Sequence, residues 1–444
     1  MSDYKIDKLK ERTTGTVLYP TTLIDAIKIS DEDSGRTLKD ILSMYGLSED
    51  YEKYSFKINL TDSNPQTRVS YFDMAAGKRP AFWNYTNGYF DYGDWSNAFF
   101  IKNMFPCMVK YDGSVDYKLD SENYLLKEDG TNSDISSAEY EGSVMVAFPT
   151  IWIKRWSDDN YLYCTIANKQ IDEDYHAYMH TDKDGKVHLY KYVGMYFSTL
   201  ITDRYKSLPN QTYTADTTFA DEAARTHMNG DLWEMFSWSD FVTIGDLLTL
   251  ISKSDNSQFS FGVGRNGATD SSSTSKKTTT DSNNMKNGGM FFNSADSGKV
   301  SFQKIFHIHD LYGEQYTRIA GLIYLNGIYF VKPYPPYSTT TENYENLNVS
   351  ISGTSDNYIK TSIVNEYGRF PTILGGSTEA TATTYECDSV VFSNTGGCIA
   401  RTRGIYNAST KGGKMALRLD KDGSADANTV NRLTCFSNDP VEGA

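Results

Sequence analysis

The chain has 444 residues, 39% hydrophobic and 23% charged, a balance typical of a globular protein with two or three cores and not of a disordered chain. Its formal net charge of −14 argues against nucleic acid as a partner, because phosphates would be repelled. No apolar run approaches the roughly 18 residues that span a bilayer, and the polar N-terminus lacks the apolar core of a secretory signal, so we expect no membrane insertion.

Residues 1–50 have the features of a separate segment. A short helical pattern formed by Leu38, Ile41, Leu42 and Tyr45 ends at Gly46, a residue suited to the C-terminal cap of a helix. The segment is too small to bury a core of its own. We therefore predict that it docks on another surface, as an attachment or oligomerisation segment.

Residues 51–142 are predicted to be a β-rich module. Its clearest signal is a hairpin around Asp112-Gly113, a dipeptide suited to a tight type I′ turn. A strand signal follows at 143–156, where Ile151, Ile153 and Arg155 fall on one face and Trp152, Lys154 and Trp156 on the other.

Two helices are expected next. Thr218 is positioned to cap a helix that ends at Gly230. Ser237 is positioned to cap a second one, in which the apolar residues follow an amphipathic spacing that Gly245 weakens slightly. Polar tracts at about 265–289 and 338–357 predict long surface loops.

Short motifs along the chain resemble, in order, a group of phage tail and fibre proteins. They run from KYDGSVDYKL and EGSVMVAFPTIWIKRW through YKYVGMYFSTL, YKSLPNQT and SQFSFGVGRNG to FHIHDLYGEQYTRIAGLIYLNGIYFV, and YGRFPTILGGS begins the closing strands. The resemblance covers roughly residues 55–436. That group is similar to the C-type lectin-like fold, in the branch that also holds formylglycine-generating enzymes and phage tropism determinants.

This resemblance implies an α+β fold in which residues 143–444 form a C-type lectin-like domain, with two helices on twisted antiparallel sheets and long displayed loops. Enzymes of that branch use a closely spaced cysteine pair near the C-terminus to bind copper. Here Cys387 and Cys398 are eleven residues apart and Cys435 lies further on, so that chemistry is not expected. The five cysteines lack a C-x-x-C spacing and indicate buried thiols from a reducing cytosol.

Metal sites were weighed at two places. His307 and His309 would face the same side of a strand and could both ligate one ion, but no third ligand is apparent, and a scaffold role is the preferred interpretation. The resemblance makes Gly313 the constrained residue of that segment. The aspartate-rich stretches 182–186 and 420–426 place glycine at the fourth position instead of the sixth, so both are predicted to be hairpin turns and not calcium loops.

The stretch ARTRGIYNASTKGGKMALRL mixes arginine, tyrosine and small polar residues between glycines, a composition typical of adaptable recognition surfaces. In tropism determinants of this fold the corresponding region contacts the receptor. The alternative is an ordinary polar loop between the last strands. The candidate ligand-binding residues are Arg401, Arg403, Tyr406, Asn407, Ser409, Thr410 and Lys411.

Together these features predict a non-enzymatic bacteriophage virion protein, made in the host cytoplasm, that acts as a tail-fibre or tail-tip receptor-binding protein and needs no cofactor. Its expected partners are a host cell-surface glycan or protein and other virion proteins. Multivalent adhesion favours a homo-oligomer such as a trimer. The alternative is a structural virion component without a receptor role, such as a head fibre, baseplate or decoration protein.

Overall fold

The computed structural model describes residues 51–84, 89–262, 291–292, 303–313, 315–376, 378–403 and 411–441. The chain divides into two units, Met1–Glu52 and Lys53–Ala444. The helix expected near residues 38–46 and the loop expected at about 265–289 lie outside the described residues. We call the second unit the 53–444 unit.

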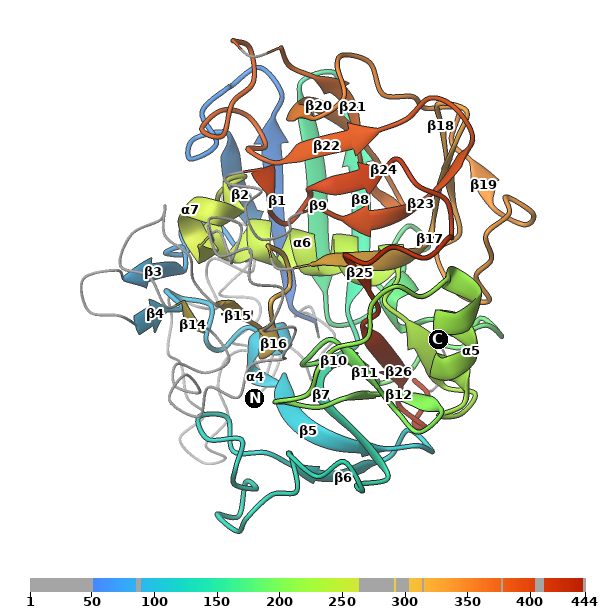
Figure 1. Ribbon diagram of the computed structural model, residues 1–444. Coiled ribbons are helices and arrows are strands. Elements are labelled where there is room, and N and C mark those ends of the chain that lie inside the picture. The colour runs from blue at the N-terminus through green and yellow to red at the C-terminus, as the bar shows by residue number, and fades with distance from the viewer. Residues whose placement is uncertain are drawn as a thin grey trace, which may run out of the picture. The chain divides into compact units, whose positions relative to one another are not determined.

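The 53–444 unit is an α+β structure in which strands dominate (Figure 1). A six-stranded sheet has the order β13-β26-β10-β7-β5-β6, and all its pairs are antiparallel. Its strands are β5 (Phe105–Lys110), β6 (Val115–Lys118), β7 (Gly142–Pro149), β10 (Tyr190–Gly194), β13 (Trp233–Met235) and β26 (Leu433–Phe436).

A second, four-stranded antiparallel sheet has the order β2-β1-β9-β8. It comprises β1 (Lys53–Asn59), β2 (Val69–Asp73), β8 (Trp152–Ser157) and β9 (Tyr161–Ala167). The expected strand at 143–156 is therefore two strands, β7 and β8, that belong to different sheets. The expected alternation holds for residues 153–156, where Ile153 and Arg155 are buried while Lys154 and Trp156 are partly exposed, but Trp152 is buried although it was expected on the face of Lys154 and Trp156.

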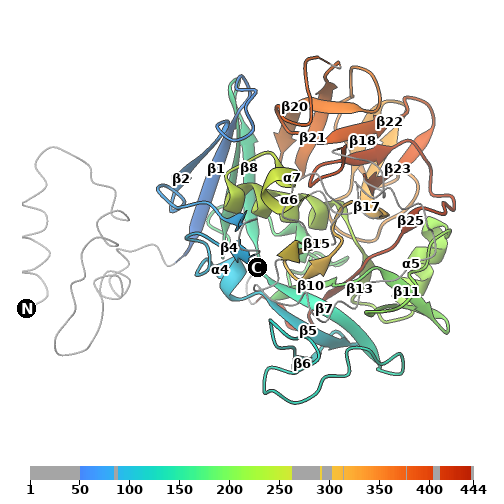
Figure 2. The same ribbon diagram turned by 60° about the vertical axis from the view of Figure 1, so that its left-hand side comes forward.

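A third sheet is built from later strands, in the order β19-β18-β17-β23-β24-β22-β20-β21, and β25 pairs with β17 in parallel. Figure 2 shows it at the end of the unit away from β5 and β6. Its strands are β17 (Tyr316–Leu325), β18 (Ile328–Val331), β19 (Glu345–Asn346), β20 (Asn357–Asn365), β21 (Gly368–Leu374), β22 (Ser389–Phe392), β23 (Gly397–Thr402), β24 (Leu417–Leu419) and β25 (Thr429–Val430).

Short elements complete the described part. Small strands pair as β3 (Phe82–Asn84) with β4 (Tyr89–Asp91), as β11 (Ser198–Ile201) with β12 (Arg204–Ser207), and as β14 (Phe291–Phe292), β15 (Gln303–Ile305) and β16 (Ile308–His309). The helices are α4 (Phe99–Lys102), η1 (Tyr178–His180), α5 (Phe219–His227), α6 (Trp238–Ser252) and α7 (Ser257–Phe261). No helix in the described ranges is long and apolar enough to cross a membrane.

Both expected helices form, and their N-terminal capping residues act as expected, but α5 ends at His227 with Met228, and not Gly230, as its C-cap. The Thr218 side chain accepts a hydrogen bond from the Asp221 amide at the start of α5. Ser237 and Asp240 form a reciprocal capping box on α6. However, α6 is not a half-exposed amphipathic helix: of its residues, only Asp246 is not buried. The reason is its position, because it runs through the middle of the unit between strands of different sheets (Figure 1).

Strands from both sides of the expected boundary near residue 142 pair with one another. β5 pairs with β7 over six residues, and β1 pairs with β9 over seven. Strands from 51–142 therefore share sheets with strands that come later in the chain. A segment whose strands are interior strands of sheets shared with another segment cannot bury a core of its own. Residues 53–142 therefore belong to the same unit as the rest of the described chain.

Two of the turn predictions also need correction. The hairpin β5–β6 forms, but of Asp112 and Gly113 only the glycine has a positive φ, so the turn is not type I′. Residues 182–186 do form a hairpin turn, closed by the pairing of Thr181 with Val187. Residues 420–426 do not, because β24 before them pairs with β22 and β23, whereas β25 after them pairs with β17.

Candidate functional site

The candidate recognition loop connects two neighbouring strands of the third sheet. β23 and β24 are antiparallel, and their last pair joins Thr402 to Leu417. The Arg403 amide donates to the Ala416 carbonyl over 2.7 Å, which extends this pairing by one step. The connection thus leaves the described strands at Arg403 and returns at Lys411, and residues 404–410 lie outside the described residues. Tyr406, Asn407, Ser409 and Thr410 lie outside the described residues.

Both ends of this connection are tied to one carboxylate. Asp356 Oδ1 lies 2.5 Å from a terminal nitrogen of Arg403 and 2.8 Å from Lys411 Nζ. Burial acts to raise the pKa of Asp356, but the hydrogen bond from Lys411 and the charge of Arg403 outweigh it and hold that pKa below its ordinary 3.8. Arg403 and Lys411 are thus brought together at the base of the loop.

Arg401, in contrast, lies inside the fold. Its side chain is 1% exposed, and its guanidinium donates to Asp426 at 2.9 Å, to Asp420 at 2.7 Å and to the Thr429 hydroxyl at 3.1 Å. A guanidinium that donates to two carboxylates and a hydroxyl, and is covered from solvent, positions the strand that carries it. Arg401 is therefore part of the support of the loop and not of its exposed surface.

The returning half of the connection is held by a buried cluster of charges. Lys414 Nζ lies 3.1 Å from Asp255, whose carboxylate also receives Arg369 at 2.9 Å and has Arg68 at 3.6 Å. Burial acts to raise the pKa of Asp255, but the charges of Arg369, Lys414 and Arg68 outweigh it and keep the carboxylate ionised. We call Arg68, Asp255, Arg369 and Lys414 the buried charge cluster.

Asp388 also holds the segment Lys414–Met415 in place through a hydrogen bond. Its carboxylate accepts a hydrogen bond from the Met415 amide over 2.8 Å. Burial raises the pKa of Asp388 to about 7, even though that hydrogen bond acts in the opposite direction. The segment Lys414–Met415 is therefore fixed through both a side chain and a backbone amide.

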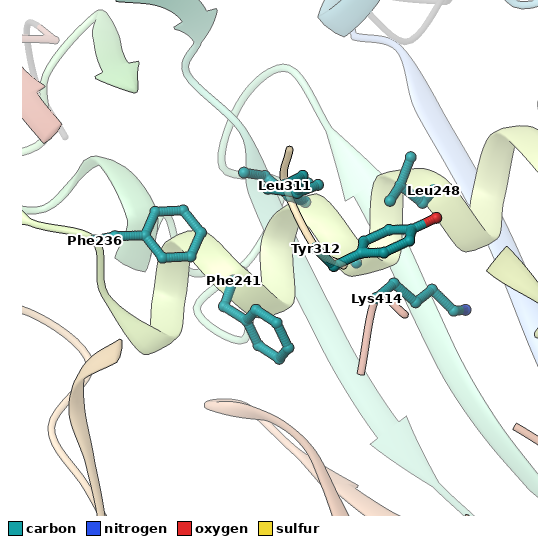
Figure 3. Close-up of a pocket in the computed structure, with 8 residues that line it drawn as sticks. Phe236, Phe241, Leu248, Leu311, Tyr312 and Lys414 are labelled. Atoms are coloured by element: carbon teal, nitrogen blue, oxygen red, sulfur yellow. The ribbon is translucent and has the colours of Figure 1, made fainter. Parts of the chain in front are cut away.

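The enclosed cavity beside this segment is too small to be a ligand site. It has a volume of about 10 Å³ and is bounded by α6, by Leu311 and Tyr312, and by Lys414 (Figure 3). A cavity needs roughly 10–15 Å³ to hold one water molecule. The contact between α6 and the returning chain is accordingly close-packed, which stiffens the base of the loop.

His307 and His309 do not converge on a common point. His307 is in a turn with φ of +63°, so the alternation of a strand does not apply to it. Its Nδ1 lies 2.6 Å from the Tyr124 hydroxyl, whereas His309 stacks on Tyr196 with ring centroids 4.7 Å apart. Burial, and then the charge of Lys304, hold both imidazole pKa values well below 6.5.

These two rings are consequently buried scaffold residues surrounded by cationic groups. Across the ranges that the structure describes, no group of three or more His, Cys, Asp or Glu side chains is arranged to hold a metal ion. The five cysteines are buried and unpaired with one another.

Two residues of this site were missed by sequence reasoning. Asp356 lies in a polar loop about fifty residues before the candidate segment, and Asp255 follows α6 within a run of small polar residues. Neither belongs to a motif, and their positions become informative only through the tertiary contacts with Arg403, Lys411 and Lys414. No protein-family model matches this sequence, and no curated protein shows a significant match to it.

Proposed function

We propose that the protein is a bacteriophage tail-fibre or tail-tip receptor-binding protein, and that the connection 403–411 contacts the host cell surface. One observation carries this proposal: Arg403 and Lys411 bracket a polar, tyrosine-containing segment and both bind the same half-exposed carboxylate, Asp356. Holding both ends of a loop rigidly lowers the conformational entropy that is lost when the loop binds.

The support beneath the loop is consistent with display. Arg401 and the buried charge cluster fix the strands on either side, so substitutions in 404–410 leave the ion pairs that hold the scaffold in place. A fixed frame that carries a replaceable polar loop suits a recognition protein whose contacts vary while its fold does not.

A C-type lectin-like fold for residues 143–444 is part of the proposal. Two features support it. The helices α5 and α6 both form, and β26, close to the C-terminus, lies in the same sheet as β7, the first strand of that region. We also propose that the protein has no catalytic activity, that it resides in the virion, and that several copies act together to raise avidity.

The test replaces Tyr406, Asn407, Ser409 and Thr410 with glycine and serine, and leaves Arg401, Arg403 and Lys411 intact because they support the frame. Fluorescently labelled full-length protein is added to a panel of intact bacterial strains, and binding is measured by flow cytometry. We expect the parent chain to label at least one strain and the variant to lose at least about tenfold in apparent affinity.

A matched variant replaces Thr339, Thr340 and Thr341, in the second polar loop, with serine and must bind as the parent does. Labelling of no strain by the parent, or equal labelling by the loop variant and the parent, would overturn the receptor role. Incorporation of the protein into particles in that case would favour the structural virion component instead.

A further inference from the structure

A surface recess lies at the edge of the six-stranded sheet. Its volume is about 350 Å³, and it is bounded by α4, by the start of β5, by the end of β6 with the chain that follows, and by Tyr190 on β10. Small-molecule sites in proteins generally measure roughly 300–1,000 Å³. The recess is therefore large enough for one small ligand, unlike the cavity beside Lys414.

Polar groups make up most of the lining of the recess, but one wall is apolar and aromatic. Pro106 and Leu119 are buried at its base, and the half-exposed rings of Phe105 and Tyr190 meet edge to face with centroids 5.4 Å apart. Aromatic rings offer a flat apolar surface with a polar edge, which suits ligands that have both apolar and hydrogen-bonding faces.

The rim carries balanced charge. Lys102 and Lys118 contribute two ammonium groups, and Asp120 and Glu128 contribute two carboxylates. Lys118 Nζ lies 4.4 Å from the centroid of the Phe105 ring, so one donor is held against the aromatic wall. Within the described ranges, none of these four groups belongs to an ion pair, although Asp120 Oδ1 accepts the backbone amides of Glu122 and Asn123, each over 2.8 Å.

This combination selects among ligand classes. For a phosphate or other anion, attraction to the two ammonium groups would be offset by repulsion from the two carboxylates, and the reverse holds for a cation, so the rim gives a ligand of net charge little advantage. A purely apolar ligand would leave the charged rim desolvated without partners. Hydroxyl groups both donate to carboxylates and accept from ammonium groups, while the C–H face of a pyranose ring covers an aromatic ring. We propose that this recess binds a neutral saccharide unit.

The proposed saccharide site is separate from the recognition loop. β6 is the outer strand of its sheet, and Figures 1 and 2 both show β5 and β6 at the end of the 53–444 unit opposite β22 and β23. The proposal does not depend on the receptor role of residues 403–411, because no residue of the recess belongs to that connection.

The experiment measures binding of neutral sugars to the full-length chain by saturation-transfer NMR and calorimetry. The probes are glucose, galactose, mannose, N-acetylglucosamine and their β-linked disaccharides. We expect at least one to bind with a Kd on the order of 1 mM. Combining Lys102→Ala with Glu128→Gln removes one exposed ammonium donor and replaces one exposed carboxylate by a neutral amide, and is expected to weaken that binding at least about tenfold.

Two further variants and the loop variant of the previous section complete the design. Lys186→Ala with Glu173→Gln makes the same chemical changes at exposed positions outside the recess, and must leave binding unchanged. Tyr190→Leu keeps an apolar side chain but removes the ring, and must weaken binding while circular dichroism shows that the fold is kept. The proposal would be overturned if none of the sugars binds, or if the rim variant binds as the parent does. It would also be overturned if sugar binding is lost in the variant in which Tyr406, Asn407, Ser409 and Thr410 are replaced.

Discussion

Individual ionic residues differ greatly in what they contribute, and burial decides which of them matter. Asp255 is fully buried and is shared by Arg369 and Lys414, whereas the Asp356 side chain is 52% exposed while it pairs with Arg403 and Lys411. Removing one partner from a buried ion pair leaves an uncompensated charge, but an exposed pair is screened by water. The two aspartates therefore form a natural comparison.

We predict that Asp255→Asn lowers the free energy of unfolding by about 3–5 kcal/mol, because Lys414 loses its buried counter-ion and Arg369 retains only Glu386. Asp356→Asn, the matched control, should cost less than about 1 kcal/mol. Urea unfolding followed by tryptophan fluorescence measures both values. Equal losses in the two variants would show that the buried charge cluster does not stabilise the fold in the way described.

The buried histidines predict a dependence of stability on pH. His307 has a folded-state pKa well below 6.5, so below pH 6.5 the unfolded chain binds a proton that the folded chain does not. Stability from this group is therefore complete above pH 6.5 and is lost as the pH falls, by up to about 1.4 kcal/mol per pH unit.

Because Asp388 titrates with the opposite sign, the measurement must compare variants. The pKa of Asp388 is raised to about 7, so this group contributes stability at low pH that is lost as the pH rises toward 7. We expect the difference in unfolding free energy between the parent and His307→Gln to be constant above pH 6.5 and to shrink between pH 6.5 and 5. A difference that stays constant over the whole range would contradict a neutral, buried imidazole.

Among the elements, α6 contains a residue of low helix propensity. Gly245 lies within the helix, where the returning segment of the loop approaches it. A methyl group at Gly245 would contact Met415 Sδ at 3.5 Å and the Lys414 carbonyl oxygen at 3.6 Å, which are ordinary van der Waals distances. Gly113, in the β5–β6 turn, differs from Gly245 because its φ is positive and neighbouring atoms leave no room for a methyl group.

We predict that Gly245→Ala stabilises the protein by about 0.5–1 kcal/mol, because alanine has the higher helix propensity and the site can accept its methyl group. Gly113→Ala should destabilise it by more than about 1 kcal/mol. There φ is +81°, and the added carbon would lie 2.9 Å from the Phe436 carbonyl oxygen. Thermal unfolding of both variants gives the two signs. Destabilisation by Gly245→Ala would mean that the glycine is needed for close packing.

For the molecule as a whole, the division of the chain decides which fragments can fold. The boundary lies at Glu52–Lys53, and residues 53–142 contribute β1 and β5 to sheets that also contain β9 and β7. Loss of those strands would expose the edges of both sheets and part of the main core.

We therefore predict that residues 53–444 fold without the first 52, whereas residues 143–444 alone do not. Circular dichroism and analytical gel filtration of the two fragments check this. A soluble 143–444 fragment with a cooperative thermal transition would show that the preceding strands are dispensable, and would restore a boundary near residue 142.

Local chemistry determined much of this structure in advance. The caps at Thr218 and Ser237, the hairpin at Asp112-Gly113 and the alternation along β8 all depend on residues a few positions apart, so sequence alone predicts them. Tertiary structure alone decided the rest. It gathers Arg68, Asp255, Arg369 and Lys414 from positions hundreds of residues apart, turns Arg401 inward, and separates His307 from His309. The physical reason is that burial and charge pairing depend on which distant strands become neighbours, and no local pattern encodes that choice.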